Sequence, residues 1–535
     1  MAAAATGYYL DIQLHRSNPY GLIRRSYREN GKVKKETLCR LPDMPLETLY
    51  AIRDALRGKT ISVDDFVVAN SREYGASYAV LSMLKQLGLH TDIFYRSTEE
   101  WVKGSIAMIV GRLVNPCSKL ALSHSSSYTA LWELCGINEI DVNKDCYDAM
   151  DRLYSRQDAI QQKLAARHLS NGTLVLYDIT SCYMEGAYEQ SDLVAFGYNR
   201  DRKRGHEQIV ISLLCTKDGC PIAVEVLKGN TSDGTTVLDK IAELRDKYHL
   251  DKVVFVGDRG MITQANNEKI NHEWVKVISA LTHGKLRAMC EEEVIQLSMF
   301  DEKNIVEVID DGIRYCLCKN PLMAEREAAT RRDLLKKTTE LLDEIIGSTR
   351  KTKYSKAMRA GRIIGKYKMG KYITFSGTDD DLRYTLNTEK IDEDAALDGC
   401  YVIFSDVPAD EMTAAEVVQT YKRLTQVEQA FRNMKTTHLE LRPVYHKTDD
   451  RIRAHVFVCM LAYYVMWHMQ QRLKQLFETD GVGKDRKYTF RYVIEILKCI
   501  TIQDIEVEGV ATTMISKPTE EQQHILDLLG VKIAC

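Results

Sequence analysis

The order of apolar runs between residues 173 and 258 constrains the fold of this sequence most. Three runs rich in aliphatic and β-branched residues read as strands: TLVLYDITS (173–181), QIVISLLCT (208–216) and PIAVEVLKG (221–229). The last two are joined by KDGC, in which Asp218-Gly219 is typical of a tight hairpin turn. A helical pattern at 235–250 then leads into a fourth run, VVFVGD (253–258). We expect three adjacent antiparallel strands, a helix and a fourth strand.

Few common folds combine these elements in that order. The ribonuclease-H-like fold does, and it carries acids at the ends of its first and fourth strands. The sequence therefore predicts an α/β protein with a ribonuclease-H-like mixed sheet as its core.

The chain is longer than one hydrophobic core usually serves, so several modules are expected. Alternating residues around a turn at 28–32 predict a small β module first, and helical spacing dominates afterwards up to residue 170. The predicted domains are a small N-terminal β module (1–45), a helical domain (46–170), the first part of the catalytic core (171–284), a strand-rich insertion with a basic segment (285–405), the last part of the core (406–475) and a C-terminal helical region (476–535).

Overall charge does not reveal a partner, because 75 acidic residues nearly cancel 73 basic ones. A basic surface must come from local clustering. Residues 350–371 contain nine Lys or Arg and no acid, with Tyr354 and Tyr367 among them. Contact with a nucleic-acid backbone is one interpretation and a solvated linker is the other. The candidate DNA-binding residues here are Lys353, Arg359 and Arg362.

The 14 cysteines are scattered and form no CxxC pair, so neither a disulfide framework nor a zinc site is expected and a reducing cytosol fits better. The N-terminus shows no secretory signal pattern. The apolar stretch 456–469 is shorter than the roughly 20 residues that span a bilayer, which favours a buried core helix. We expect a cytoplasmic protein without membrane contact.

Three acids are the candidate catalytic residues. Asp178 and Asp258 each end an apolar strand of the predicted sheet, although either alone could be a turn former or a helix cap. Glu428 lies in a predicted helix over 412–438, which starts at a capping box formed by Thr413 and Glu416. Helical geometry places Glu428 in a partly apolar stripe, as expected of a metal ligand, but a surface Glu paired with Arg432 at i+4 is equally compatible.

Together the three acids support a more specific hypothesis. Two Asp and one Glu that converge at a sheet can hold two Mg²⁺ ions about 4 Å apart, with Mn²⁺ as an alternative ion. Such a pair activates an attacking water or 3′-hydroxyl and stabilises the leaving oxygen of a phosphodiester.

Four segments in this order resemble the DDE transposases of bacterial insertion sequences, specifically the "insertion sequence four" superfamily with a strand-rich insertion before the catalytic Glu. They are YDIT, the stretch from FGYNRDRKRG to GNTSDGTTVL, VFVGDRGM, and YKRLTQVEQAFRNMK. The resemblance covers about residues 7–475. It implies a transposase that cuts DNA at the inverted repeats of its own element and joins the ends to target DNA.

The resemblance also implies roles for single residues. The catalytic, metal-binding acids are Asp178, Asp258 and Glu428, and the helix signature Y-x2-R-x3-E-x6-K places Tyr421 and Lys435 next to DNA. Expected partners are double-stranded DNA and a second copy of the chain in a synaptic dimer, in a bacterial cytoplasm and associated with the nucleoid. The helical domain at 46–170 is expected to recognise the element's ends.

One position departs from the signature, because Leu424 stands where the family has Arg. Arg423 points some 140° away from Glu428 on a helical projection, whereas Arg432 lies within about 40° of it. Arg432 is therefore a candidate phosphate ligand or an ion-pair partner of Glu428. Arg259 either reaches a phosphate or stabilises its turn, and Arg204 belongs to a basic loop that either contacts DNA or is simply solvated.

Two other functions fit the same fold. One is an inactive or repurposed DNA-binding protein, and the other is a metal-dependent nuclease without strand transfer. The presence of all three acids argues against loss of the site. The insertion and the long helical domain favour the transposase, because a plain nuclease needs neither.

Overall fold

The computed structural model describes residues 8–14, 19–29, 32–41, 44–58, 66–201, 203, 205–270, 273–301, 303–348, 353–378, 381–481, 486–507 and 510–534. The chain divides into two compact units. One comprises Met1–Leu153 with Val465–Cys535, and the other comprises Tyr154–Tyr464. The three candidate catalytic acids all belong to the second unit.

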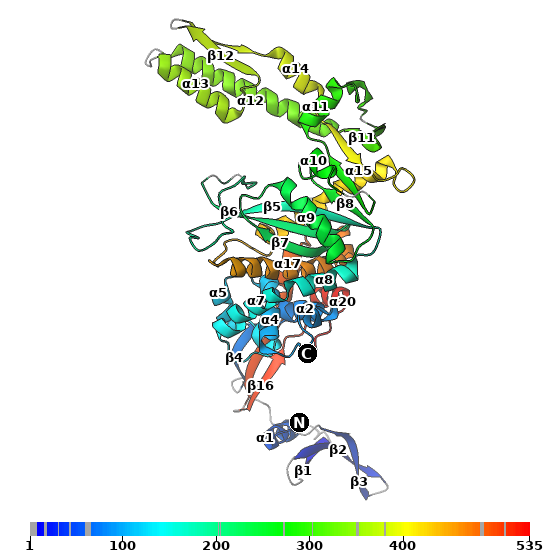
Figure 1. Cartoon of the computed structure of the whole chain (residues 1–535). Coiled ribbons are helices and arrows are strands. Elements are labelled where there is room, and N and C mark those ends of the chain that lie inside the picture. The colour runs from blue at the N-terminus through cyan, green and yellow to red at the C-terminus, as the bar shows by residue number, and fades with distance from the viewer. Residues whose placement is uncertain are drawn as a thin grey trace. The chain divides into compact units, whose positions relative to one another are not determined.

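An eight-stranded mixed sheet forms the centre of the second unit (Figure 1). Its strand order is β10-β11-β14-β9-β8-β5-β6-β7. The strands are β5 (Thr173–Tyr183), β6 (Gln208–Thr216), β7 (Pro221–Leu227), β8 (Val253–Gly257), β9 (Val275–Ala280), β10 (Val306–Asp310), β11 (Ile313–Lys319) and β14 (Cys400–Ser405). β5, β6 and β7 pair antiparallel in sequence order and β8 pairs parallel to β5, which confirms the predicted arrangement.

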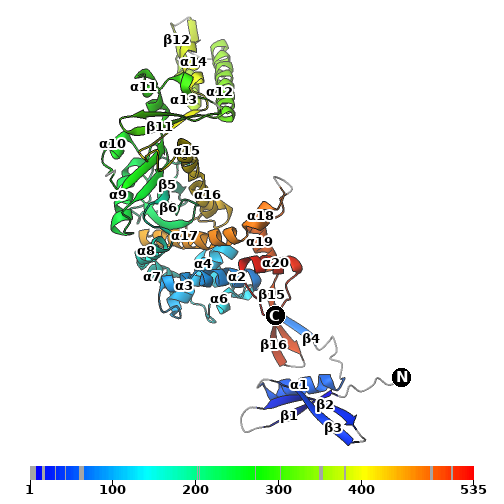
Figure 2. The ribbon, with the colours of Figure 1, turned by 90° about the vertical axis from the view of Figure 1, so that its right-hand side faces the viewer.

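The two faces of β5 have different roles because side chains alternate along a strand. Val175, Tyr177 and Ile179 are buried in a core that also contains residues of α8 (Gln157–His168) and α9 (Asp233–Asp246). Asp178 and Thr180 therefore point to the other face. That face is covered by α16 (Leu424–Arg432), which packs against β5 (Figure 2).

The predicted insertion is not separate from this sheet. Its strands β10, β11 and β14 continue the central sheet, and β14 pairs with β9 as well as with β11. Short elements precede them: α10 (Gln264–Asn267), α11 (His283–Glu291) and the 3₁₀ turn η4 (Leu297–Met299).

Between β11 and β14 the chain forms an arm, defined here as residues 321–397. It consists of α12 (Pro321–Gly347), α13 (Lys353–Tyr367), the hairpin β12 (Ile373–Thr378) and β13 (Asp381–Leu386), and α14 (Thr388–Ala396). Figures 1 and 2 show α12 and α13 side by side. The arm has its own small core, formed by Leu342, Ala360, Met369, Tyr372 and Ile373.

The segment after the arm was predicted as one helix over 412–438. It forms α15 (Ala414–Lys422), α16 and the wide helical turn η5 (Asn433–Thr437). The capping box of Thr413 and Glu416 at the start of α15 is confirmed.

The first unit is mostly helical between residues 75 and 155. Its helices there are α2 (Gly75–Gln86), α3 (Leu89–Ile93), α4 (Glu100–Val114), α5 (Lys119–Ser123), η2 (Ser125–Ser127), α6 (Leu131–Leu134), η3 (Val142–Asp148) and α7 (Ala149–Ser155), whose end enters the second unit. The C-terminal helices are α18 (Lys474–Glu478), α19 (Phe490–Lys498) and α20 (Glu520–Leu529).

The predicted C-terminal helical region also contains strands. β15 (Thr501–Val507) and β16 (Val510–Ile515) form a hairpin there, and β15 also pairs with β4 (Phe66–Glu73) inside the predicted helical domain. These strands stabilise one another across a long stretch of sequence, so no local pattern marks the sheet.

The N-terminal module is a three-stranded antiparallel sheet of β1 (Tyr8–Gln13), β2 (Tyr20–Glu29) and β3 (Lys32–Arg40), with helix α1 (Leu46–Leu56) packed against it. The predicted β module is therefore present. Residues 30 and 31 of the predicted turn lie outside the described residues.

Helix α17 (Asp449–Arg472) contains the apolar stretch 456–469. Val456 to Met466 are almost completely buried, as expected for a core helix. No helix in the described part of the chain is long and apolar enough to cross a membrane. The thirteen cysteines of that part are all free thiols.

Candidate active site

The pairing register of β5 and β8 brings the two aspartates to the same level. The last parallel pair is Tyr177 with Gly257, so the next residues on the two neighbouring strands are Asp178 and Asp258. Asp258 directly follows β8 in a tight turn, in which Met261 N–H donates to the Asp258 carbonyl at 3.1 Å. Gly260 permits this turn with a φ of 85°.

Asp178 does not lie at a strand end as predicted. β5 continues to Tyr183 because its second half still pairs with β6, beyond the point where β8 stops. The apolar run therefore ends before the strand does. Asp178 nevertheless lies beside the carboxyl end of β8, where Asp258 follows.

The third acid comes from α16. The helix break at Arg423 separates α15 from α16, and the Arg423 guanidinium bonds the Asp218 carboxylate of the β6–β7 turn at 3.1 Å. This agrees with the projection that turns Arg423 away from Glu428. The buried residues Val427, Ala430 and Phe431 hold α16 in place, while Glu428 is exposed on another side.

One pocket of about 230 Å³ collects the candidate residues. Its lining includes the three acids, Arg259, Tyr421 and Leu424. The Tyr421 hydroxyl donates to Asp258 Oδ1 at 3.0 Å, and the Arg259 N–H donates to the same oxygen at 2.7 Å. The structure therefore brings Asp178, Asp258 and Glu428 together with Tyr421, the first residue of the helix signature.

The electrostatics of the pocket reflect crowded negative charge. Burial, the charge of Asp258 and the charge of Glu428 raise the pKa of Asp178 to about 7, against the effect of the Ile179 N–H, which donates to Asp178 Oδ1 at 2.8 Å. Burial and the neighbouring Asp258 likewise raise the pKa of the Tyr421 hydroxyl. A carboxylate with such a raised pKa is one that a cation would stabilise.

The donor set fits hard divalent cations. Three carboxylates line one pocket, and Glu428 has no ion pair among the described residues, Arg432 included. The oxygens of the three acids do not all lie within 4.8 Å of one another, so the described acids do not form a tight single-ion cluster. Two ions about 4 Å apart require a wider set of carboxylates than one ion does.

Lys435 occupies a different environment from the one the family signature implies. It is buried, and its ammonium donates to Thr180 Oγ1 at 2.7 Å and to Asp201 Oδ1 at 3.3 Å. Burial lowers the pKa of Lys435. Arg442 shares the Asp201 carboxylate through a 2.8 Å bond to Oδ2.

Sequence reasoning missed Asp201 and Arg442. A signal was available, since Asp201 is the one acid in the basic stretch 200–204. An isolated carboxylate among cations often forms buried ion pairs with residues that come from elsewhere in the chain.

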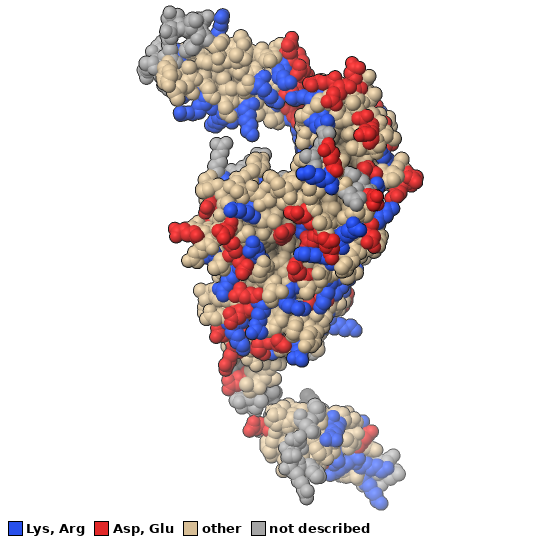
Figure 3. Space-filling view, in the orientation of Figure 1, with Lys and Arg blue, Asp and Glu red and all other residues tan. Residues whose placement is uncertain are grey.

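The remaining DNA-binding candidates are distributed over several elements. Arg432 and Arg259 are exposed, and neither forms an ion pair with any described residue. Arg359 and Arg362 are exposed on α13. Figure 3 shows Lys and Arg side chains along one side of the arm. Arg204 and the side chain of Lys353 lie outside the described part of the structure.

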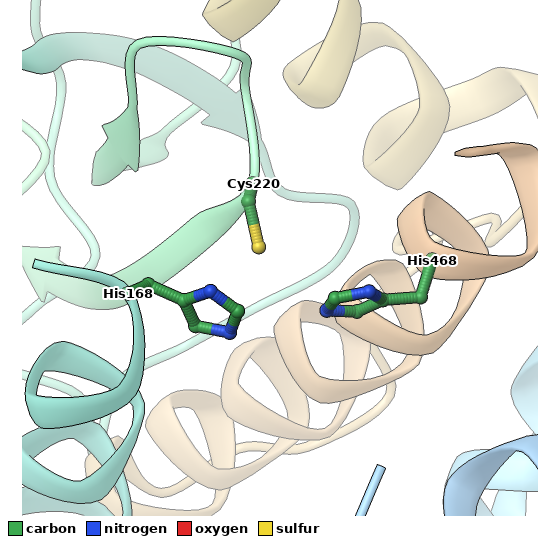
Figure 4. Close-up of side chains that lie close together, drawn as sticks. All are labelled: His168, Cys220 and His468. Atoms are coloured by element: carbon green, nitrogen blue, oxygen red, sulfur yellow. The ribbon is translucent and has the colours of Figure 1, made fainter. Parts of the chain in front are cut away.

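Figure 4 shows three further side chains of types that bind metal ions: His168, Cys220 and His468. His168 ends α8 and Cys220 precedes β7. His168 Nε2 shares a hydrogen bond of 2.9 Å with the Tyr464 hydroxyl, and burial raises the pKa of Cys220. His468 belongs to the other unit, and no metal site is assigned to these residues.

Two aspartates lie on neighbouring strands of a mixed sheet, and a helix that packs on the sheet carries a glutamate. This arrangement is typical of enzymes whose active site consists of carboxylates. The family model "Transposase DDE domain" matches residues 172–465, more than half of the chain, and the chain belongs to this family. It is therefore a DDE transposase with a ribonuclease-H-like catalytic domain.

A second family model, "IS1634 family transposase, N-terminal domain", matches residues 14–69. Residues 14–69 are therefore similar to that N-terminal domain. The expectation of the "insertion sequence four" superfamily is confirmed as far as a DDE transposase.

No curated protein matches the chain. Among solved structures it is similar to the cryo-EM structure of a piggyBac transposase synaptic complex with hairpin DNA. The similarity covers 79% of this chain and 75% of that one, with 9% sequence identity and a TM-score of 0.37.

Proposed function

We propose that this protein catalyses cut-and-paste transposition. It cleaves DNA at the terminal inverted repeats of its own element and transfers the resulting 3′ ends to target DNA. Its substrate is double-stranded DNA, and a homodimer brings the two ends together in the cytoplasm of a bacterium, at the nucleoid.

The observation that supports this proposal is the convergence of Asp178, Asp258 and Glu428 on one pocket. Each acid alone has an ordinary structural explanation. Their common position, on two paired strands and on the helix that packs against one of them, is what phosphodiester chemistry at a metal site requires.

The three carboxylates are the residues that would hold Mg²⁺ or Mn²⁺. The bound ions supply charge neutralisation at the attacking and leaving oxygens of the phosphodiester. The chain's own residues orient this site. Tyr421 and the Arg259 N–H hold the Asp258 carboxylate, and the Ile179 N–H holds that of Asp178.

Several cations are proposed to contact the DNA backbone. Arg259, Arg432 and Tyr421 are near the pocket, and Lys435 joins them when its bond to Asp201 opens. The basic segment of the arm, with Lys353, Arg359 and Arg362, and Arg204 in the basic loop would contact phosphates farther from the cut. Each neutralised phosphate releases counterions and adds a salt-dependent contribution to affinity.

A cleavage assay tests the proposal directly. Purified protein is incubated with a labelled duplex that carries the gene's own flanking ends, with Mg²⁺ or with EDTA, and the products are resolved on a denaturing gel. We expect Mg²⁺-dependent cuts at the repeat boundary and 3′-hydroxyl ends that later join to a target plasmid. Cuts without joining would instead indicate a nuclease, and a duplex of scrambled sequence is the control.

One observation favours a second candidate, a protein that binds ends without cutting them. Leu424 is buried at the position where the family signature has Arg, and it lines the pocket. A pocket without that guanidinium has one cation fewer for the scissile phosphate. Specific binding with no cleavage in either Mg²⁺ or Mn²⁺ would support this alternative.

A further inference from the structure

The N-terminal module, residues 8–58, concentrates positive charge in a chain that is nearly neutral overall. The formal net charge of the protein is −2. Residues 20–40 nevertheless carry seven cations against two acids, namely Arg24, Arg25, Arg28, Lys32, Lys34, Lys35 and Arg40 against Glu29 and Glu36. This charge lies on β2 and β3, which belong to the first unit.

One face of the N-terminal sheet is covered by α1. Leu10 and Leu49 are buried there, and Gly21 lies between them. A Cβ atom at Gly21 would lie 2.8 Å from Cδ2 of Leu49 and 2.9 Å from Cδ1 of Leu10, so α1 packs closely on this side. The pairing of Leu10 with Ile23 adds Ile23 to the same face.

The opposite face, called the open face here, includes Tyr9, Tyr20, Arg24, Lys35 and Arg40, together with Asp11, Leu22, Ser26 and Thr37. The register assigns them to one side: Tyr9 pairs with Arg24, Leu22 pairs with Arg40, and Ser26 pairs with Lys35. Residues that pair directly in an antiparallel sheet point to the same face, and residues two apart on a strand do too.

Contacts on the open face agree with this assignment. The Arg40 guanidinium lies 4.2 Å from the Tyr20 ring centre, and the Lys35 ammonium lies 5.8 Å from that of Tyr9. Arg24 pairs with Asp11 at 2.5 Å. The Tyr9 hydroxyl and Arg24 Nε are enclosed without a hydrogen-bond partner, and β3 is exposed at every position. The side chains of Lys35 and Arg40 are therefore accessible to a ligand on this face.

We propose that the open face binds a groove of duplex DNA and contributes to recognition of the element's ends. The ligand class follows from the residues, since arginine and lysine bind phosphates and guanine edges, and tyrosine contacts sugars, phosphates and base edges. The major groove accommodates a β-ribbon such as β2–β3. This inference rests on the proposed function for the choice of DNA as the partner, and it adds a recognition surface outside the helical domain at 46–170.

The test compares two pairs of substitutions with equal charge change in the full-length chain. Lys35→Ala with Arg40→Ala removes two cations from the open face. Lys34→Ala with Arg25→Ala removes two cations from the other face, because Lys34 pairs with Tyr27 and Arg25 pairs with Tyr8. Binding to a labelled duplex of the gene's own ends and to a scrambled duplex is followed by fluorescence anisotropy in EDTA, at several salt concentrations.

We expect the open-face pair to weaken binding to the gene's own ends at least tenfold and to reduce the salt slope by about 2, since each phosphate contact contributes about 1. The control pair should stay within threefold of the parent. Equal effects of the two pairs, or a change below twofold for the open-face pair, would overturn the inference. So would a changed oligomeric mass by light scattering with unchanged DNA affinity, because the face would then bind a second copy.

The result is separable from the proposed function. Binding is measured without metal, so face-dependent binding by a protein that never cuts DNA would leave the inference intact and reject only the proposed activity. If the protein cleaves DNA but the open-face substitutions do not change its binding, the proposed activity stands and only this inference is rejected.

Discussion

At the scale of single residues, Asp258 has the most constrained position in the pocket. Its carboxylate accepts hydrogen bonds from Tyr421 and from the Arg259 N–H, and these fix its orientation. Asp258→Asn should abolish cleavage and leave binding to the ends equal or slightly tighter, because it removes a charge that repels phosphate. Gel-based cleavage and anisotropy on the same preparation check both parts. Wild-type cleavage by Asp258→Asn would refute the assignment of the metal site.

Tyr421→Phe should slow cleavage less than Asp258→Asn does. It removes one hydrogen bond to a charged group, and we expect a roughly tenfold slower single-turnover cleavage, which corresponds to about 1.4 kcal/mol. The fold should be unaffected, so the melting temperature serves as the control. An unchanged rate would mean that this hydrogen bond does not orient Asp258 during the reaction.

The raised pKa of Asp178 predicts how the stability of the metal-free protein depends on pH. Its pKa is raised from 3.8 to about 7 in the folded protein, so the folded chain keeps a proton that the unfolded chain has already released at intermediate pH. The contribution of Asp178 to the free energy of unfolding is therefore largest below about pH 4, and it is lost as the pH rises to 7. In EDTA at pH 8, Asp178→Asn should melt at a higher temperature than the parent. Mg²⁺ should raise the melting temperature of the parent more than it raises that of Asp178→Asn.

Circular dichroism melts at pH 5 and pH 8 measure this effect. The difference between the two proteins should be smaller at pH 5, where the parent also carries the proton on Asp178. A lower melting temperature for Asp178→Asn at pH 8 would contradict the electrostatic interpretation.

At the scale of elements, the basic helix of the arm provides a separate prediction. Arg359 and Arg362 are exposed on α13, so Arg359→Glu with Arg362→Glu should not change the melting temperature. If α13 contacts phosphates, the pair should weaken DNA binding about tenfold or more near 0.1 M salt and flatten its salt dependence. Arg359→Lys with Arg362→Lys keeps the charge and should restore most of the affinity. Unchanged affinity in the Glu pair would mean that this face of α13 is solvated and does not contact DNA.

The same scale shows which parts of the fold could be predicted from sequence. The order β5-β6-β7-α9-β8 follows from local patterns, because each strand is a short apolar run and Asp218-Gly219 marks the hairpin. The sheet of β4, β15 and β16 could not be predicted, since its strands pair across most of the chain. The helix break at Arg423 also escaped prediction, because no Pro or Gly marks it in the sequence.

Prediction of the site followed the same rule. Asp178, Asp258, Glu428 and Tyr421 were identified by motif and spacing, and the structure places all four in one pocket. The burial of Lys435 against Asp201 was not predicted, because a loop carries Asp201 to it from more than two hundred residues earlier in the chain.

At the scale of the whole molecule, the cysteines provide a test of the fold. Among the thirteen described thiols, Cys39 on β3 and Cys499 after α19 are exposed, whereas burial raises the pKa of others such as Cys182 and Cys316, both to about 12. Only thiolates react with alkylating reagents. Mass spectrometry after brief alkylation at pH 7.5 should therefore find Cys39 and Cys499 labelled first among these thirteen, and fast labelling of Cys182 would contradict the fold.

The arm leaves and re-enters the central sheet at directly opposite positions. Lys319, the last residue of β11, pairs with Cys400, the first residue of β14. Two residues paired in this way are close enough for a two-residue turn to join them. The arm is thus a cassette: about eighty residues connect two points that a simple hairpin would connect equally well. The arm could therefore be lengthened, shortened or exchanged while the β5–β8 register that aligns the two aspartates is kept.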